Sequence, residues 1–395
     1  MNPTENDFSS HPFSQAEGCA AAAQPVLKVI GLGGGGCNAV ERMMALQLRG
    51  IEFIAANTDA QALKSNPAPT RILLGPTVTR GFGAGGDPRC GKEAAEESRA
   101  QIAAALAGAD MVFLTAGMGG GTGTGAIPVA AEIARAQGAV TIAIVTMPFG
   151  FEMGRRQKNA MDGITHLREH THTLIAIPND RLLEAASRNL PLELAFRLAD
   201  DVLRQAVQGV TELITEPGLI NVDFAHIRRL ILLGGGALMS IGQGQGEDKA
   251  YQALDQALHH PLLEDVVLEN AAGVIANFTG GSDLTLFEVQ SALTNLQART
   301  GSQTEIIFGV INDERMDGRA QVILLITGLG GRSLEEAMPG FSKGASQPAG
   351  KRQEQVQAVE TAPTPVGEPV PLTASPLSRD LPPFFRYRSQ DPYRR

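Results

Sequence analysis

The sequence predicts an α/β protein whose first domain is a doubly wound parallel sheet, followed by a long core helix, a smaller α+β C-terminal domain and a disordered tail. Over residues 26–190, short aliphatic runs alternate with helical segments, which is typical of a parallel sheet covered by helices on both faces. Over residues 191–216, apolar residues recur at steps of three or four and predict one amphipathic helix. Residues 332–379 are rich in Pro, Gln, Ser, Glu and Ala and show neither the hydrophobic period of a helix nor that of a strand. We therefore expect a disordered linker there.

The aliphatic runs of the first domain have apolar residues on both faces, as buried parallel strands do. Residues 1–25, which precede them, are polar and then Ala-rich, and we expect a disordered lead. The predicted strands are VLKVI (26–30), IEFIAA (51–56), RILL (71–74), MVFLTA (111–116), VTIAIVTM (140–147) and TLIAI (173–177). Together with the helices between them they define the first domain, residues 26–190.

The core helix has start and stop signals at both ends. Pro191 suits a first helical turn, and the pair Pro217-Gly218 ends the helix. Its buried stripe consists of Ala195, Leu198, Val202, Ala206, Val210 and Leu213. Residues 217–331 then form the predicted C-terminal α+β domain. In that domain we expect strands near 228–233, 272–278, 304–310 and 320–327 and helices near 246–258 and 284–298.

Composition and charge exclude several classes of protein. With no Trp and 5% aromatic residues, the cores must be aliphatic, and the hydrophobic fraction of 43% is ample for them. The net charge of −9 argues against a protein that binds nucleic acids. The 3 cysteines form no C-x-x-C pair, which favours a reducing compartment. No apolar run reaches the roughly 18 residues that span a bilayer, and the N-terminus has no apolar signal core, so we expect a cytoplasmic protein.

The stretch VIGLGGGGCNAV places Gly31, Gly33 and Gly36 in a G-x-G-x-x-G pattern between a predicted strand and a helix. Glycines let the backbone approach a pyrophosphate, whose charge suits a helix N-terminus. Asp59, just beyond the next strand, lies near the place where a dinucleotide-binding fold has its ribose-binding acid. This loop alone leaves an NAD-dependent enzyme open, although no catalytic set of His, Arg and acid is visible.

A second glycine-rich loop, GMGGGTGTGA (117–126), again follows a predicted strand and opens a helix. Its glycines alternate with Thr122 and Thr124, whose hydroxyls can cap a helix, and its successive amides can bind an anion. Two such loops in one sheet favour a nucleotide with several phosphates at the carboxyl ends of the strands. The stretch GDPRCGKE (86–93) is not a P-loop, because Glu93 stands where Ser or Thr is needed and no strand precedes it.

The histidines favour solvated helix ends over a metal site. His166 and His170 are four residues apart, but H-L-R-E-H lacks the Glu at the second position of the zinc motif H-E-x-x-H. His259 and His260 precede Pro261 and indicate the end of a helix, where a cation suits the helix dipole.

At GGGTGTG the sequence resembles the tubulin/FtsZ family of GTPases, and within it the bacterial FtsZ proteins. The resemblance covers about residues 26–331 and rests on independent motifs in family order. These motifs are GGGGCNAV (33–40), NTDAQAL (57–63), GAGGDP (83–88), AGMGGGTGTGA (116–126), PFGFE (148–152), IPND (177–180), AVQGVTELI (206–214), PGLINVDFA (217–225) and PLLEDV (261–266). The resemblance implies an N-terminal GTP-binding domain and a C-terminal domain that completes the active site of a neighbouring subunit.

Carried over position by position, the resemblance implies a site for GTP or GDP. The residues implied to hold the phosphates are Gly34, Gly35, Gly36, Cys37, Asn38, Gly121, Thr122 and Gly123. Glu152 and Arg156 match the family's ribose and phosphate contacts, and the other residues implied to bind the nucleotide are Asn179, Phe196, Asp200 and Asp201. Phe196 would stack on guanine, and Asp201 would accept hydrogen bonds from its N1 and N2 groups. Cys37 stands where the family usually has Gly, and Asp200 stands where it usually has Asn.

In this family GTP lies between subunits, and two acidic residues three apart polarise the attacking water beside the neighbour's γ-phosphate. The segment NVDFAH (221–226) supplies Asn221 and Asp223, but His226 stands at the second acidic position. A carboxylate suits Mg²⁺ or K⁺ and orients water, whereas a neutral imidazole is a poor ligand for these ions and tends to be protonated beside a triphosphate. We therefore expect GTP binding and head-to-tail assembly, with hydrolysis slower than is typical of the family.

Two functions remain open: a GTP-hydrolysing filament protein of the bacterial division ring, and an FtsZ-like structural or regulatory polymer that binds GTP with little turnover. We expect Mg²⁺ to arrive with the nucleotide, K⁺ is a second candidate, and no protein side chain is assigned as a metal ligand. The tail DLPPFFR, within the terminal segment 380–395, resembles the peptide that docks on membrane-anchored division adaptors and implies a place at mid-cell. Its docking residues are Asp380, Leu381, Pro382, Phe384, Phe385 and Arg386.

Overall fold

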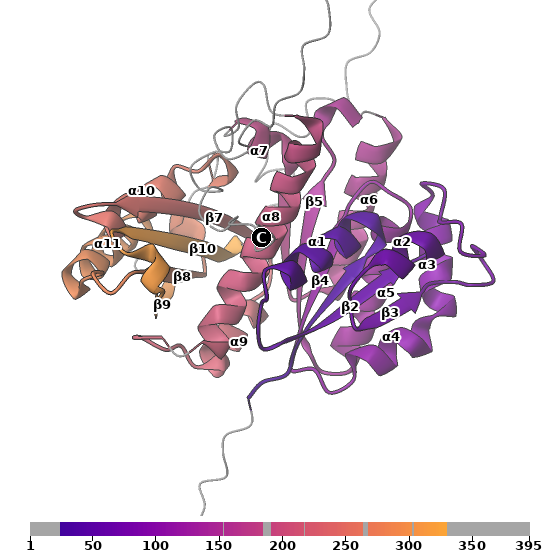
Figure 1. Cartoon of the computed structure of the whole chain (residues 1–395), viewed down its shortest axis with the longest axis horizontal. Coiled ribbons are helices and arrows are strands. Elements are labelled where there is room, and N and C mark those ends of the chain that lie inside the picture. Colours follow the sequence, from indigo (N-terminus) through magenta and orange to yellow (C-terminus); the bar gives the residue numbers. More distant parts are fainter. Residues whose placement is uncertain are drawn as a thin grey trace, which may run out of the picture.

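The computed structural model describes residues 24–152, 154–184, 191–216, 218–263, 268–301 and 304–329. Within them one 10-stranded sheet runs through the molecule in the order β3-β2-β1-β4-β5-β6-β7-β10-β8-β9. Figure 1 shows the two halves of the chain on either side of α8. The expected lead as far as residue 23, the linker and the docking peptide lie outside the described residues.

The bounds of the elements follow the order of the chain. The strands are β1 (Leu27–Leu32), β2 (Ile51–Asn57), β3 (Thr70–Leu73), β4 (Met111–Gly117), β5 (Val140–Met147), β6 (Thr173–Pro178), β7 (Gly236–Gln245), β8 (Gly273–Gly280), β9 (Glu305–Asn312) and β10 (Arg319–Leu329). The α-helices are α1 (Gly33–Ala45), α2 (Ala60–Ser65), α3 (Pro88–Glu97), α4 (Arg99–Leu106), α5 (Thr122–Ala136), α6 (Arg155–His170), α7 (Asn179–Glu184), α8 (Leu192–Thr215), α9 (Phe224–Leu232), α10 (Lys249–Leu258) and α11 (Leu286–Arg299). Single 3-10 turns are η1 (Gly150–Glu152), η2 (Pro261–Leu263), η3 (Leu268–Asn270) and η4 (Glu314–Met316).

Strands β1 to β6 are parallel, and helices cover both faces of this half of the sheet, which confirms the predicted α/β fold. Alternate residues of β1 enter opposite cores. Leu27 and Val29 pack with α1, α8 and α9, whereas Ile30 and Leu32 pack with α3 to α6. Because the carboxyl ends of parallel strands lie at one edge, the loops after β1, β2, β4 and β5 gather there.

The C-terminal half is the expected mixed α+β unit. β7, β10 and β8 are antiparallel, and β9 adds to β8 in parallel. Helices α10 and α11 bury Leu254 and Leu296 in a core on one face of these strands. The core helix α8 packs on the other face, where a Cβ on Gly209 would lie 2.9 Å from Ile323 of β10. No helix within the described ranges is long and apolar enough to cross a membrane.

One predicted strand is wrong. Residues 228–233 lie mostly in helix α9, and the next strand begins only at Gly236. Asp223 starts the helix, since its Oδ1 accepts the N–H of Ala225 at 3.0 Å. Ile227, Leu230 and Ile231 are the buried residues of α9, and their spacing is that of one helix face. The run IRRLILL obscures this spacing, because a short apolar run fits a strand as well as a helix.

Candidate functional site

The two glycine-rich loops touch each other at the carboxyl edge of the sheet. β1 and β4 are neighbours, with Leu32 opposite Ala116, so that α1 and α5 begin side by side. A Cβ on Gly33 would lie 2.7 Å from the nitrogen of Gly123, and one on Gly36 would lie 2.3 Å from the carbonyl oxygen of Thr115. Any side chain there would clash with backbone, so these glycines are required for the loops to meet.

Other glycines of the same loops face open space. No heavy atom lies within 4 Å of a Cβ built on Gly34 or Gly120. The turn before α5 is held by Thr124, whose Oγ1 accepts the N–H of Gly119 at 2.9 Å, and Gly119 itself has a φ of +96°. The first N–H groups of α1 and α5 have no partner within their helices, and together they form a place for an anion.

Two further segments support the second glycine loop. The hydroxyl of Thr58, a buried residue after β2, lies 2.6 Å from that of Thr122. The stretch that is similar to a P-loop is the start of α3, capped by Asp87, and a Cβ on Gly91 would lie 2.3 Å from the carbonyl oxygen of Gly121. This stretch therefore packs behind the loop as a helix, which agrees with its exclusion as a Walker motif.

An aromatic cluster lies at the start of α8, beside the loop after β5. The buried ring of Phe149 meets Phe196 edge to face, with centroids 5.3 Å apart, and stacks with Phe151 at 5.1 Å. Phe196 is exposed, so its ring is available to stack on a planar base. The arrangement supports the predicted role of Phe196 as the guanine platform.

Residues at the start of α7 complete this side of the site. Asn179 is buried, and its Oδ1 has no hydrogen-bond partner among the residues described. A buried amide oxygen without a partner is a place where a ligand N–H can bind. Its neighbour Asp180 accepts the N–H of Gly150 at 2.9 and 3.0 Å and so holds the loop after β5 in place.

Asp200 and Asp201 have different surroundings. Asp201 accepts hydrogen bonds from Arg204 Nε and Gln205 Nε2, both at 2.7 Å, and Arg204 is buried. Asp200 is four residues after Phe196 and therefore on the same face of α8. Burial raises the pKa of Asp200 to about 6, against the lowering effect of Arg42, and the charge of Asp201 raises it further.

Three of the predicted site residues have side-chain partners within the chain, namely Glu152, Arg156 and Cys37. Glu152 pairs with Arg156, and its Oε1 accepts the N–H of Phe149 at 3.1 Å. Cys37 is buried, and its Sγ lies 3.7 Å from the oxygen of Gly31 and 3.6 Å from that of Ala56. Burial raises the pKa of the Cys37 thiol to about 12, more than the bond to Ala56 lowers it. The thiol side chain therefore faces the core, and only the backbone of Cys37 remains for a phosphate.

The segment NVDFAH lies at the other end of α8. Leu219 N–H donates to the oxygen of Val310 at 2.8 Å, which fixes the segment beside β9. Asn221, Asp223 and His226 are exposed. The Oδ1 of Asn221 accepts the N–H of Gly218 at 2.7 Å, while that of Asp223 caps α9. Along α8 the helix rise separates Phe196 from Thr215 by about 30 Å, so this segment cannot reach the glycine loops of its own subunit.

Comparison with known proteins agrees with this architecture. Residues 26–187 match the GTPase domain of the Tubulin/FtsZ family, and residues 235–330 match the C-terminal domain of the FtsZ family. The solved structure of an empty FtsZ dimer from M. jannaschii is 45% identical, with a TM-score of 0.75 over 78% of this chain and 89% of that chain. The chain belongs to the tubulin/FtsZ family.

Two solved structures of lower sequence identity share the fold. CetZ2 from Haloferax volcanii, solved as a GTPγS-bound protofilament, has a TM-score of 0.68 over 80% of this chain and 98% of that chain, at 19% identity. CetZ1 from the same organism, solved as a GDP-bound monomer, has a TM-score of 0.67 at the same identity. Membership confirms the family inferred from the sequence, so this chain is a GTP-binding protein of an FtsZ-like cytoskeletal family.

Within this tubulin/FtsZ fold, most of the residues predicted to bind the nucleotide lie together. The residues predicted to be catalytic lie elsewhere, far from that group. The glycine loops, Asn179, Phe196 and Asp200 lie at the carboxyl edge, whereas the NVDFAH segment lies beyond the far end of α8. The sequence did not reveal the contacts of Thr58, Phe149 and Asp180, although all three lie inside motifs that carry the resemblance. No cluster of three or more His, Cys, Asp or Glu in the described part of the chain is placed to hold a metal ion.

Proposed function

We propose that this protein binds GTP at the carboxyl edge of its N-terminal sheet and polymerises head to tail, hydrolysing GTP only between subunits. The observation that carries the proposal is the separation of the two halves of the site. The glycine loops and Phe196 lie at one end of α8, and Asp223 lies beyond the other end. A complete site then needs two subunits in a head-to-tail contact, which generates a filament when it repeats.

The nucleotide lies with its phosphates on the glycine loops and its base beside Phe196. The open space at Gly34 and Gly120 supports this placement, because backbone N–H groups there can approach an anion. We assign the guanine-reading carboxylate to Asp200 in preference to Asp201. Asp200 shares the face of α8 that carries Phe196, while Asp201 is bound to Arg204 and Gln205.

Exposed apolar residues support assembly at both ends. Phe82 and Phe151 are exposed in the loops at the carboxyl edge, beside the glycine loops. Leu219, Leu286 and Phe287 are exposed at the opposite end, around the carboxyl ends of β8 and β9. Two different apolar surfaces at the two ends favour a head-to-tail contact, in which each meets the other on a second copy.

Hydrolysis would rely on Asp223 of one subunit acting on GTP held by the next. Its carboxylate can orient the attacking water, and Asn221 shapes the segment that carries it. Mg²⁺ would be held by the nucleotide phosphates, with K⁺ as a second candidate ion. His226 stands three residues later, on the exposed side of α9, in the position of a second carboxylate. Because an imidazole is a weak ligand for these ions, we propose slow turnover.

A second function is favoured by the same residue. If His226 abolishes turnover, the protein is a structural or regulatory polymer that binds GTP without consuming it. Light scattering and phosphate release, measured on one concentration series with GTP, separate the two. Phosphate release that begins at the concentration where scattering begins supports the first function, and scattering without phosphate release supports the second. Phosphate release that is proportional to concentration throughout, with no threshold, contradicts a site made by two subunits.

We further propose that the filament forms the division ring at mid-cell in the cytoplasm. The support is the family membership together with the terminal stretch DLPPFFR, which is similar to a peptide that docks on membrane-anchored adaptors. The test compares the full chain with its variant Phe384→Ser. Loss of ring localisation with unchanged filament assembly in solution supports docking through the peptide, whereas unchanged localisation contradicts it.

A further inference from the structure

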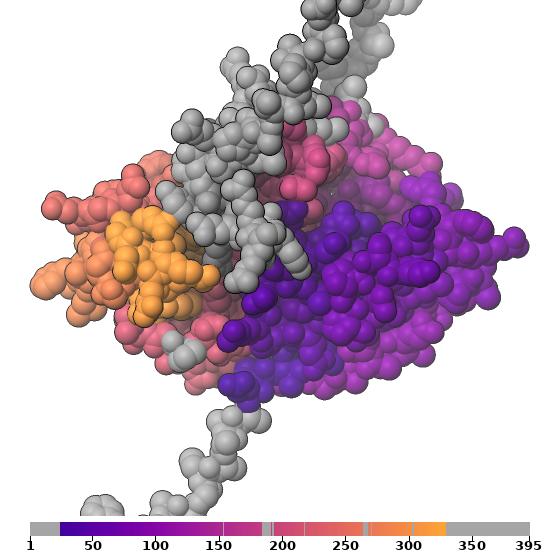
Figure 2. All heavy atoms as spheres, viewed as in Figure 1, coloured from indigo at the N-terminus to yellow at the C-terminus, as the bar shows by residue number. Residues whose placement is uncertain are grey.

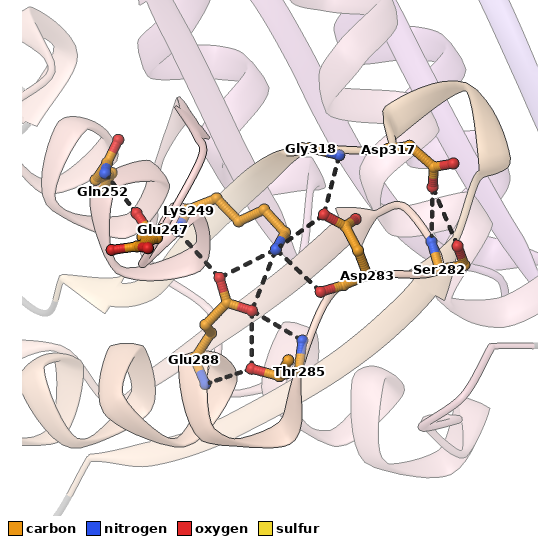
Figure 3. Close-up of polar contacts among 9 residues, drawn as sticks. All are labelled: Glu247, Lys249, Gln252, Ser282, Asp283, Thr285, Glu288, Asp317 and Gly318. Carbon is orange, nitrogen blue, oxygen red and sulfur yellow. Dashed lines mark hydrogen bonds and ion pairs between the residues drawn. The ribbon is translucent and has the colours of Figure 1, made fainter.

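A buried lysine at the start of α10 bonds to the loop between β8 and α11, which lies about 35 residues further along the chain. The Lys249 Nζ lies 3.1 Å from Glu288 Oε1, 3.3 Å from Asp283 Oδ2 and 3.0 Å from the backbone oxygen of Asp283 (Figure 3). The backbone N–H of Lys249 also donates to Glu288 Oε1 at 3.2 Å. The side chain of Lys249 is only 5% exposed, so these carboxylates replace the water that the ammonium would otherwise need.

The partners of Lys249 hold the loop between β8 and α11. Glu288 and Thr285 form a capping box that starts α11. Asp283 Oδ2 accepts the N–H of Gly318 at 3.1 Å, and Asp317 Oδ1 accepts the N–H of Ser282 at 3.0 Å (Figure 3). The loop is thereby attached to α10 on one side and to the turn before β10 on the other.

Electrostatics keeps this cluster charged. Burial lowers the pKa of Lys249, but the bonds to Glu288 and Asp283 outweigh it and raise the pKa above its ordinary value. The hydrogen bond from Gly318 is the largest cause that lowers the pKa of Asp283. A lysine at the first residue of a helix is opposed by the helix dipole, so the position of Lys249 is explained by its two carboxylates and not by α10 itself.

The loop that Lys249 fixes carries an apolar tip. Leu286 and Phe287, the first two residues of α11, are 73% and 83% exposed and pack against little of their own chain. The core of the domain is built by later residues of the helix, such as Val289 and Leu296. A capping box alone can start α11, so the added attachment through Lys249 fixes the direction of a tip that the core does not use.

We propose that Lys249 is a positioning residue for filament assembly, which holds the Leu286–Phe287 tip in the direction in which it packs against the next subunit. This inference rests on the proposed head-to-tail assembly. A tip that is already ordered loses less conformational entropy on binding than a mobile one. Lys249 itself is buried, so its effect passes through Glu288 and Asp283.

The test is a double-mutant cycle in the full chain between Lys249→Met and Phe287→Ser. The readout is the critical concentration for GTP-dependent pelleting, measured at a temperature where circular dichroism shows every variant folded. Lys249→Met keeps the length of the side chain but removes the charge, and we expect it to raise the critical concentration by about fivefold or more. In the Phe287→Ser background the same change adds less than about twofold, because the tip no longer contributes.

Lys249→Arg retains the charge and is expected to recover most of the assembly. Lys28→Met is the matched control, since Lys28 is also buried and pairs with Glu52 in the N-terminal domain. We expect it to cost stability without coupling to Phe287. If Lys249→Met does not fold, Asp283→Asn takes its place in the cycle, because the Asp283 side chain is 45% exposed and tolerates the change.

Each outcome of the cycle either supports or overturns the positioning role of Lys249. Equal effects of Lys249→Met in the two backgrounds, or an unchanged critical concentration, overturn the role of Lys249 in positioning. Binding of a fluorescent GTP analogue by the unassembled protein stays unchanged if the role is confined to assembly. Failure of the unaltered protein to pellet with GTP contradicts the proposed assembly instead, so the two failures are distinguishable.

Discussion

Phe196 and Asp223 lie at opposite ends of α8, with Phe196 packed edge to face on Phe149 and Asp223 capping the helix that follows. Figure 2 shows one face of the molecule, with the N-terminal half in indigo and purple on one side and the C-terminal half in orange on the other. In the proposed function, these two places are the two halves of one active site. Because α8 separates Phe196 from Asp223, the two residues would meet at one nucleotide only through a second subunit.

Asp223→Asn should abolish turnover without loosening α9. The change removes the negative charge but keeps the side-chain oxygen that accepts the N–H of Ala225. We expect phosphate release by assembled protein to fall by about 100-fold or more, with GTP binding by the monomer unchanged. Asp223→Ala also loses the cap and should cost about 1 kcal/mol of stability. Phosphate release by Asp223→Asn at the unaltered rate would remove Asp223 from the mechanism.

His226→Asp should raise turnover. The change restores a second carboxylate on the exposed side of α9, where it can hold a cation and orient water. We expect phosphate release per assembled subunit to rise by about tenfold or more. His226→Asn is the control, because it shortens the side chain without adding charge and should not raise the rate. Unchanged or lower turnover of His226→Asp in filaments would contradict the slow-turnover proposal.

The sequence predicted the fold at the carboxyl edge of the parallel sheet well, because the constraints there are local. The aliphatic strands β1 and β4 are buried on both faces, and each is followed at once by a glycine-rich loop, in which a side chain on Gly33 or Gly36 would clash with backbone. Contacts between distant segments were not predictable in this way. Thr58 and Thr122 are 64 residues apart, and no spacing within the chain shows that their hydroxyls meet.

Burial bears on two of the interpretations made from the sequence. The base-reading role of Asp201 stays a prediction, and our preference for Asp200 depends on Arg204, which is buried and takes Asp201 as its partner. The two histidines at the end of α10 also differ in burial. His259 is exposed and sits at the helix end as expected, but His260 is buried, and burial lowers its pKa to about 4. The interpretation of His260 as a cation at a helix end is therefore wrong.

Gly36→Ala should destabilise the fold, whereas Gly34→Ala should not. A methyl group on Gly36 would lie 2.3 Å from the oxygen of Thr115, while one on Gly34 would meet nothing within 4 Å. We expect Gly36→Ala to lower the free energy of unfolding by about 2 kcal/mol or more. Gly34→Ala should leave it within about 0.5 kcal/mol and weaken only GTP binding. Thermal unfolding without nucleotide checks both, and equal stability of the two variants would contradict the close contact of the loops.

His260 should make the protein sensitive to acid. Its pKa is about 4 in the folded protein because of burial, and about 6.5 in an unfolded chain. Folding therefore favours the neutral form of His260. The stability that depends on this neutral form is complete above pH 6.5 and is lost as the pH falls towards 4. The loss amounts to about 3 kcal/mol. Urea unfolding between pH 7 and 4 should show a flatter profile for His260→Gln, while His259→Gln should behave like the unaltered protein.

Because of Asp200, GTP binding should weaken in mild acid. The same residue should make the unliganded protein more stable in mild acid. Burial raises its pKa to about 6 in the unliganded protein, so the folded state gains stability as the pH falls through 6 and loses it as the pH rises. Guanine N–H groups need the ionised carboxylate as an acceptor. Between pH 7 and 5 we therefore expect the affinity for GTP to fall by about tenfold. In Asp200→Asn the affinity should stay nearly constant over this range, as measured by titration with a fluorescent GTP analogue. The same fall in Asp200→Asn, or its abolition by Asp201→Asn alone, would move the base-reading role back to Asp201.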